Sequence, residues 1–288
     1  MKLIFIHGRA QETFEELALR QIWIDTLNEG LKKSGLTLPT NVTIEFPYYG
    51  KLLKKLVDDF EEVGTRDIGG LDEDDFEKMV FFQDFLIEMT DKIDMPAEEK
   101  MELLESQTTS RGILNWEIIQ NLLERIDSRD YFGELAIKKF TYDVFMYLTA
   151  GDVKKQVNEL IEKYFNAEPC VVVGHSLGTI VSYLVLKNNP DFKVKKFITL
   201  GSPLGSVSVN KYLELPLEMP YCVQNGWFNA YDERDVVALN PLDNRYFDIN
   251  PSIENKNDVN NHTDNRHGIV GYLNDAVVAK KIYDALML

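Results

Sequence analysis

The sequence predicts an α/β fold, in which buried strands alternate with helices, and a helical insertion interrupts this alternation. Short, continuously apolar runs at 3–6, 170–173 and 194–200 are typical of strands that are buried on both faces. Helical patterns follow the first two of these runs. Residues 51–135 contain helical blocks and no strand pattern. We therefore expect a core formed by residues 1–50 and 136–288, with 51–135 as an inserted unit.

Length and charge limit the classes of protein. At 288 residues the chain can bury a large core as one domain with a sizeable insertion. The formal net charge of −16 argues against nucleic acid or an anionic membrane as the main partner, since cationic side chains would have to neutralise phosphates. No stretch approaches the roughly 20 apolar residues that cross a bilayer. We expect a soluble protein.

The cysteines and the N-terminus favour the cytoplasm. Cys170 and Cys222 lie in apolar or strand-like surroundings without a short metal-ligand spacing, so we expect reduced, structural thiols. The apolar run at the N-terminus is four residues long and ends in His7 and Arg9, which is too short for a signal peptide.

Further elements are predicted on both sides of the insertion. An amphipathic helix is expected at 11–33, with Phe14, Leu17, Ala18, Ile22, Leu27 and Leu31 on its apolar face. A strand is expected at 42–46, core helices at 140–165 with Asp152 as an N-cap, and a final helix at about 273–286.

The predicted insertion is a helical cap. Its blocks lie at 52–60, 76–93, 98–105 and 113–126, joined by Asp-rich or Gly-containing links. The block at 76–93 carries a broad apolar stripe of Phe76, Met79, Val80, Phe82, Phe85, Leu86 and Met89. A helical cap over a catalytic face would exclude water and shape an apolar pocket. The alternative is a helical subdomain that stabilises the core or binds a partner.

A pentapeptide between a predicted strand and a predicted helix contains a candidate catalytic serine. Gly174-His175-Ser176-Leu177-Gly178 follows the apolar run at 170–173, and apolar residues then recur at helical spacing. The glycines leave room for a sharp turn that exposes the hydroxyl of Ser176 above the sheet. The amide of Leu177, at the start of the helix, can point toward a developing oxyanion. A turn whose serine merely caps the helix is the structural alternative.

This pentapeptide, in this context, resembles the nucleophile elbow of the esterases and lipases of the α/β-hydrolase superfamily. The resemblance implies a mostly parallel sheet flanked by helices, and triad partners in the order serine, acid, histidine. It also implies that the His7-Gly8 turn after the first strand supplies a second oxyanion donor. We assign this donor to the amide of Arg9, with Ala10 as the alternative.

The chain offers four histidines as the base. His7 precedes the proposed oxyanion turn, and His175 is expected to point away from Ser176. The chain order then leaves His262 and His267. We prefer His267, because it directly precedes the packed final helix, which would hold it better than the polar loop around His262.

The acid is expected after a strand at 226–231. Family members commonly carry the acid just before a small apolar pair, which favours Asp235, followed here by Val236-Val237. Asp232, at the end of the strand, is the alternative. The proline that usually follows the acid is Val236 here.

The sequence therefore predicts a serine hydrolase that cleaves a small-molecule acyl ester through Ser176, His267 and Asp235, without a cofactor or a metal. The polar loop at 250–265 has neither a glycine nor the spacing of a calcium loop. Thioesterase, amidase and acyltransferase chemistry use the same residues. Two further alternatives are a catalytically inactive binding or regulatory protein of the same fold, and an interfacial lipase.

Overall fold

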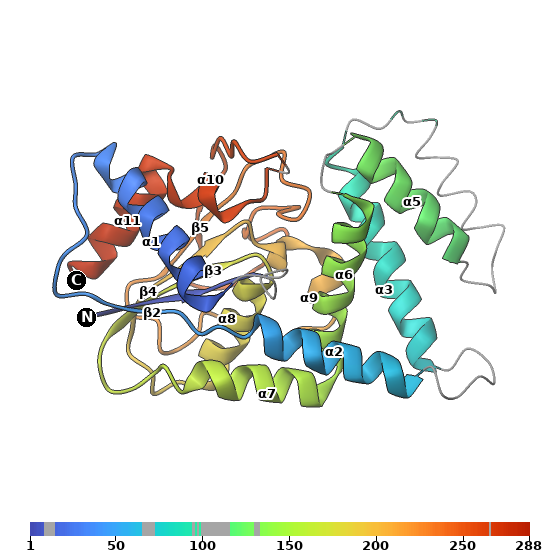
Figure 1. Ribbon diagram of the computed structural model, residues 1–288, viewed down its shortest axis with the longest axis horizontal. Coiled ribbons are helices and arrows are strands. Elements are labelled where there is room, and N and C mark those ends of the chain that lie inside the picture. Colours follow the sequence, from blue (N-terminus) through green and yellow to red (C-terminus); the bar gives the residue numbers. More distant parts are fainter. Residues whose placement is uncertain are drawn as a thin grey trace.

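The core is a six-stranded sheet whose strand pairs are all parallel, in the order β2-β1-β3-β4-β5-β6 (Figure 1). This computed structural model describes residues 1–8, 15–64, 73–93, 96, 98, 116–129, 133–264 and 266–288. Helices flank the sheet, so the predicted α/β fold with a mostly parallel sheet is confirmed.

Five of the strands lie where the sequence predicts strands. The six are β1 Lys2–Ile6, β2 Thr43–Glu45, β3 Cys170–His175, β4 Val194–Leu200, β5 Trp227–Ala230 and β6 Glu254–Lys256. The sequence predicts a polar loop at 250–265, where the structure has the strand β6. It is a short Glu-Asn-Lys strand that pairs only with β5. An edge strand that is not enclosed on both faces lacks the apolar run on which the other predictions rest.

Alternate residues of the strands pack on opposite faces of the sheet. On one face, Leu3 and Phe5 join the cluster that includes side chains of α1 (Glu16–Lys32), α10 (Ile269–Leu273) and α11 (Ala276–Leu286). On the other face, Ile4 and Ile6 pack in the cluster that contains α8 (Leu177–Asn188) and the inserted helices. Because both faces are buried, the central strands consist of continuous apolar runs.

The predicted apolar face of the first helix is partly wrong. Leu17 is 76% exposed and Ile22 is 38% exposed, whereas Leu19 and Trp23 are buried. The helix begins at Glu16, and residues 9–14, including Phe14, lie outside the described residues. The buried stripe runs through Leu19, Trp23, Leu27 and Leu31, which recur every four residues. Leu27 and Leu31 belong to the predicted apolar face, whereas Leu19 and Trp23 do not.

The segment between β2 and β3, which contains the predicted insertion, is helical where it is described. It comprises α2 Gly50–Gly64, α3 Glu73–Thr90, α5 Trp116–Arg129, α6 Glu134–Thr149 and α7 Gly151–Glu162. The predicted block at 98–105 lies outside the described residues, apart from residue 98. The N-cap of α7 is Ala150 rather than Asp152, which lies in the first turn of the helix. The predicted boundary at 135 falls inside α6, so that helix continues from the insertion into the core.

The apolar stripe of α3 faces the protein interior. Met79, Phe82, Phe85 and Met89 are buried in the same cluster as the α8 face of the sheet, while Phe76 is 55% exposed. The inserted helices therefore share one continuous core with the sheet, rather than forming a separate one.

Glu88 attaches α3 to the segment after β4. Its carboxylate accepts the backbone N–H groups of Val207 at 2.9 Å and Ser208 at 2.7 Å, and hydroxyl hydrogen bonds from Ser206 and Ser208. These groups begin the short helix α9 (Val207–Asn210). One helical turn earlier, Asp84 pairs with Lys211 at 2.7 Å. Charged hydrogen bonds thus supplement the apolar packing between insertion and core.

Candidate active site

The candidate site lies where the strand order reverses. β1 has β2 on one side and β3 on the other, so the order of the strands changes direction between β1 and β3. Gly8, after β1, and Ser176, after β3, meet there. A Cβ built at Gly8 would lie 2.7 Å from the Cβ of Ser176, so only glycine allows this approach.

Ser176 sits on a strained turn between β3 and α8. Its φ of 56° is in the region that L-residues rarely adopt, and it is the N-cap of α8. Cβ atoms at Gly174 and Gly178 would lie 2.9 Å from the carbonyl oxygen of Gly178 and 2.3 Å from that of Ile6, respectively. The predicted roles of these two glycines are thus explained by steric contact. Leu177 is the first residue of the helix, which places its amide beside Ser176.

Hydroxyl groups hold the turn. The hydroxyl of Thr179 donates to the carbonyl oxygen of Ser176 at 2.6 Å, and its oxygen lies 2.8 Å from that of Ser202. Since the Thr179 proton is already used, the hydroxyl of Ser202 is the donor between the two. The strained backbone is therefore fixed by a buried chain of hydrogen bonds.

Ser176, His267 and Asp235 form a hydrogen-bonded series. His267 Nε2 lies 2.8 Å from Ser176 Oγ, and His267 Nδ1 lies 2.8 Å from Asp235 Oδ2. All three are buried, at 3%, 6% and 0% exposure. Since the carboxylate only accepts hydrogen bonds, Nδ1 carries the proton and Nε2 of a neutral ring is left to accept the serine proton. The structure thus brings together the three residues selected from the sequence.

Asp235 has further donors that the sequence did not indicate. The amides of Val237 and Ala238 donate to Oδ1 at 2.9 Å and 3.3 Å. The hydroxyl of Tyr272 donates to Oδ2 at 2.5 Å. Burial, and then the charge of Asp235, raise the pKa of Tyr272 well above its ordinary value, so that the phenol keeps its proton. Both oxygens of this buried carboxylate are therefore satisfied.

Asp232 and His262, the alternatives predicted from the sequence, lie outside the hydrogen-bonded series of Ser176, His267 and Asp235. Burial would raise the pKa of Asp232, but hydrogen bonds from Arg234 and from the amide of Asn261 outweigh burial and lower it. Asp232 thus connects the loop that carries Asp235 to the loop that leads to His267. His262 is exposed. Neither residue belongs to the series that ends at Ser176.

His7 braces the turn after β1. Its Nδ1 donates to the carbonyl oxygen of Gly8 at 2.6 Å, its Nε2 accepts the amide of Tyr49 at 3.1 Å, and the rings of His7 and Tyr49 stack at 4.3 Å. Burial lowers the pKa of His7 to about 4, so the ring is neutral at pH 7. Arg9 and Ala10, the two candidates for the second oxyanion donor, lie outside the described residues.

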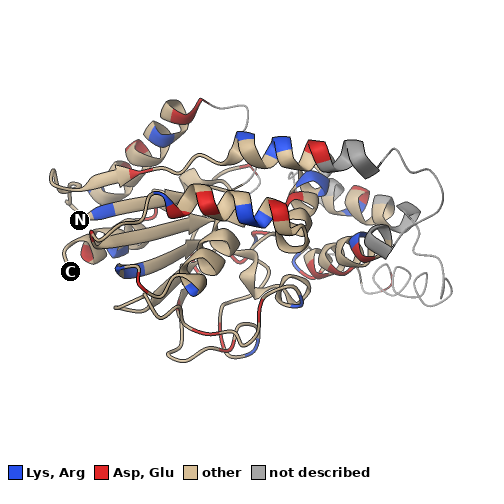
Figure 2. Ribbon diagram, turned by 90° about the horizontal axis from the view of Figure 1, so that it is seen from below, with Lys and Arg blue, Asp and Glu red and all other residues tan. Residues whose placement is uncertain are grey.

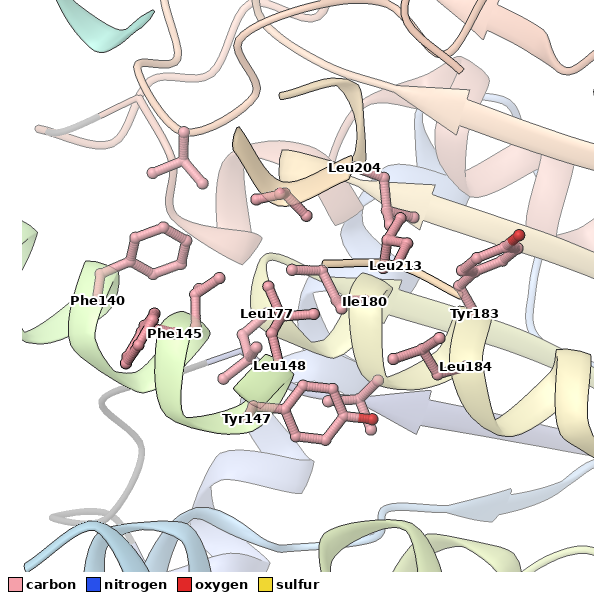
Figure 3. Close-up of a cluster of buried hydrophobic side chains, with 14 of the residues drawn as sticks. Phe140, Phe145, Tyr147, Leu148, Leu177, Ile180, Tyr183, Leu184, Leu204 and Leu213 are labelled. Carbon is pink, nitrogen blue, oxygen red and sulfur yellow. The ribbon is translucent and has the colours of Figure 1, made fainter. Parts of the chain in front are cut away.

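Apolar side chains surround the serine on the insertion side. Figure 3 shows Phe140 and Phe145 of α6 beside Leu177 and Leu148. The ring of Phe140 meets that of His267 edge to face, with centroids 6.3 Å apart. The described side chains beside Leu177 on this side are therefore apolar.

Among the residues that the structure describes, no group of three or more His, Cys, Asp or Glu is placed to hold a metal ion. Within the same ranges, no helix is long and apolar enough to cross a bilayer. Cys170 and Cys222 are free and buried. Figure 2 shows Lys and Arg interspersed with Asp and Glu along the outer helices.

A parallel sheet with flanking helices, and a strained serine between β3 and α8, define a class of fold: the chain has an arrangement consistent with the α/β-hydrolase fold. Residues 107–244 match the family model described as lipase (class 3). The matched range includes Ser176 and Asp235 and ends before His267. This similarity supports a lipase-like hydrolase in general terms. No curated protein and no solved structure matches the chain.

Proposed function

We propose that the chain is a serine hydrolase that cleaves carboxylic esters, with Ser176 as nucleophile, His267 as general base and Asp235 as the acid that orients the base. The observation that carries this proposal is the buried series from Ser176 Oγ through His267 to Asp235, with both links at 2.8 Å. A nucleophile bonded to a base, itself oriented by a third group, is the arrangement that activates a serine hydroxyl.

The reaction would proceed in two steps. Nε2 of His267 takes the proton of Ser176 as Oγ attacks the ester carbonyl, and the resulting imidazolium gives that proton to the departing alcohol. Water then loses a proton to His267 and attacks the acyl-serine, and the imidazolium returns that proton to Ser176 Oγ as the carboxylic acid is released. We assign the oxyanion to the amide of Leu177 and to a second amide after Gly8, at Arg9. No cofactor enters either step.

We expect the substrate to carry an apolar acyl or alcohol part. Phe140, Leu177 and Leu204 are buried and belong to the cluster on the insertion side of the serine (Figure 3). Residues 51–135 would then act as a cap that excludes water from the reaction. Thioesters and amides, and acyl transfer to another acceptor, would use the same serine and histidine.

Labelling with a fluorophosphonate tests the proposal without knowledge of the substrate. An activated serine forms an O–P bond and expels fluoride, which intact mass detects as a single adduct. We expect the adduct on the wild type and none on Ser176→Ala. His267→Ala and Asp235→Asn should greatly slow labelling, while the matched variants His262→Ala and Asp232→Asn, where folded, should retain it.

A folded wild type that stays unlabelled by small and large fluorophosphonates would contradict the proposal. The inactive binding protein would then be the better hypothesis. Equal labelling of His267→Ala and the wild type would remove His267 from the role of base.

A further inference from the structure

We propose that His175 is a positioning residue that fixes the base through its backbone: its neutral ring ties the nucleophile turn to the loop that carries His267. This inference rests on the proposed function of Ser176 and His267 and extends it to a residue that the sequence had left without a role. His175 immediately precedes Ser176, so one side chain connects the two halves of the site.

The hydrogen bond of His175 determines its tautomer. Its Nε2 lies 2.8 Å from the backbone carbonyl oxygen of His267. A carbonyl oxygen only accepts, so Nε2 carries the proton. If this hydrogen bond were lost, the buried carbonyl group of His267 would lack the donor that His175 supplies.

The ring also supports the base by contact. The rings of His175 and His267 lie 4.8 Å apart with an interplanar angle of 32°. The ring of His175 also contacts two other rings: Trp23 meets it edge to face with centroids 6.1 Å apart, and the centroid of Tyr272 lies 5.9 Å from its own. The ring of His267 is therefore positioned by two contacts, with the carboxylate of Asp235 at Nδ1 and with the ring of His175. A misplacement of about 1 Å at such a site can reduce the rate about a hundredfold.

The neutral state of His175 suits this position. Burial lowers its pKa well below the ordinary value, and the neighbouring His267 and, more weakly, His7 lower it further, against the hydrogen bond to the His267 carbonyl. Tyr272 and Trp23, the other rings against it, carry no charge. During the proposed reaction His267 becomes a cation, and a second cation on the adjacent ring would oppose that step.

Two substitutions separate the hydrogen bond from the ring. His175→Gln keeps an N–H donor at a position close to Nε2, whereas His175→Phe keeps a ring and removes the donor. We expect His175→Phe to slow fluorophosphonate labelling about ten- to a hundredfold, because loss of the hydrogen bond lets the backbone and ring of His267 shift. His175→Gln should stay within about threefold of the wild type. A purely structural role would instead make labelling follow the loss of thermal stability in both variants.

NMR of protein with ¹⁵N-labelled histidines provides a readout that needs no activity. In the wild type we expect His175 to hold its Nε2–H form without titrating between pH 5 and 8. The Nδ1–H of His267, assigned by its absence in His267→Ala, should be slow to exchange in the wild type and in His175→Gln, and fast in His175→Phe.

The proposal is overturned if His175 titrates in that range or holds its proton on Nδ1, a result that requires no variant to fold. It is also overturned if folded His175→Phe leaves both labelling and the His267 proton unchanged. A wild type that is not labelled, but whose His267 proton still depends on His175, would reject the proposed function and retain the positioning role.

Discussion

The hydroxyl of Tyr272 donates to Oδ2 of Asp235 at 2.5 Å, the same oxygen that lies 2.8 Å from Nδ1 of His267. Tyr272 also accepts the amide of Asp232 at 3.3 Å, so its hydroxyl has both a donor and an acceptor. It stands in α10, five residues after the histidine. The helix that follows His267 thus supplies a hydrogen bond to Asp235, the partner of the His267 ring.

Tyr272→Phe removes this donor without changing the packing of the ring. We expect a loss of about 1.5–3 kcal/mol in the free energy of unfolding, because the hydrogen bond ends on a buried charge. With one donor fewer, the buried carboxylate of Asp235 is less well satisfied, so the pH dependence of fluorophosphonate labelling should change.

Urea unfolding and the pH dependence of fluorophosphonate labelling measure the two effects. Tyr221→Phe is the matched control, since Tyr221 is 88% exposed, and it should change neither quantity. An unchanged pH profile in a destabilised Tyr272→Phe would show that the hydroxyl serves the fold and leaves the base unaffected.

Gly8→Ala should displace the nucleophile. The new Cβ would stand 2.7 Å from Cβ and 3.2 Å from Oγ of Ser176, so one of the two segments must move. We expect labelling to slow at least about a hundredfold. The cost in stability should be about 1–3 kcal/mol, as in other overpacked sites.

Gly151→Ala provides the comparison, because a Cβ there has no atom within 4 Å and the residue begins α7. It should label like the wild type and gain about 0.4–1 kcal/mol in stability. Labelling of Gly8→Ala at the wild-type rate would contradict the close approach of the two loops.

His7 should make the fold sensitive to acid. Its folded pKa of about 4 is lower than the ordinary 6.5, so the unfolded chain takes up a proton at a pH where the folded protein does not. Stability is therefore lost as the pH falls from about 6.5 to about 4, by about 3 kcal/mol for this residue. His175 acts in the same direction.

His7→Asn isolates the contribution of His7. It keeps a donor toward the carbonyl of Gly8 and has no titrating ring, so it should be less stable at pH 7 but lose about 3 kcal/mol less on acidification to pH 4. His262→Asn, at an exposed position, should follow the wild type. Parallel curves of unfolding free energy against pH for wild type and His7→Asn would exclude His7 as the cause.

Local patterns predicted the strands that are buried on both faces and the turn at Ser176. The runs at β1, β3 and β4 are apolar because both faces are covered, and this signal is contained in a few consecutive residues. The same rule failed for β6, whose three polar residues pair only with β5 at the edge of the sheet. In α1 the helical periodicity is predicted correctly, but Leu17 and Ile22 are exposed because they lie beside the i, i+4 row of Leu19, Trp23, Leu27 and Leu31 that packs on the sheet.

The sequence by itself determined the elbow around Ser176 and a short set of candidates for the acid and the base, since backbone strain and chain order are local or linear properties. Only the tertiary structure placed Asp235 and His267, rather than Asp232 and His262, in the hydrogen-bonded series that ends at Ser176, because that series joins residues up to 91 positions apart. It also shows that Tyr272 is hydrogen-bonded to Asp235 and that His175 is hydrogen-bonded to the backbone carbonyl of His267. Their partners are brought together by the packing of the sheet and its helices, which no spacing along the chain encodes.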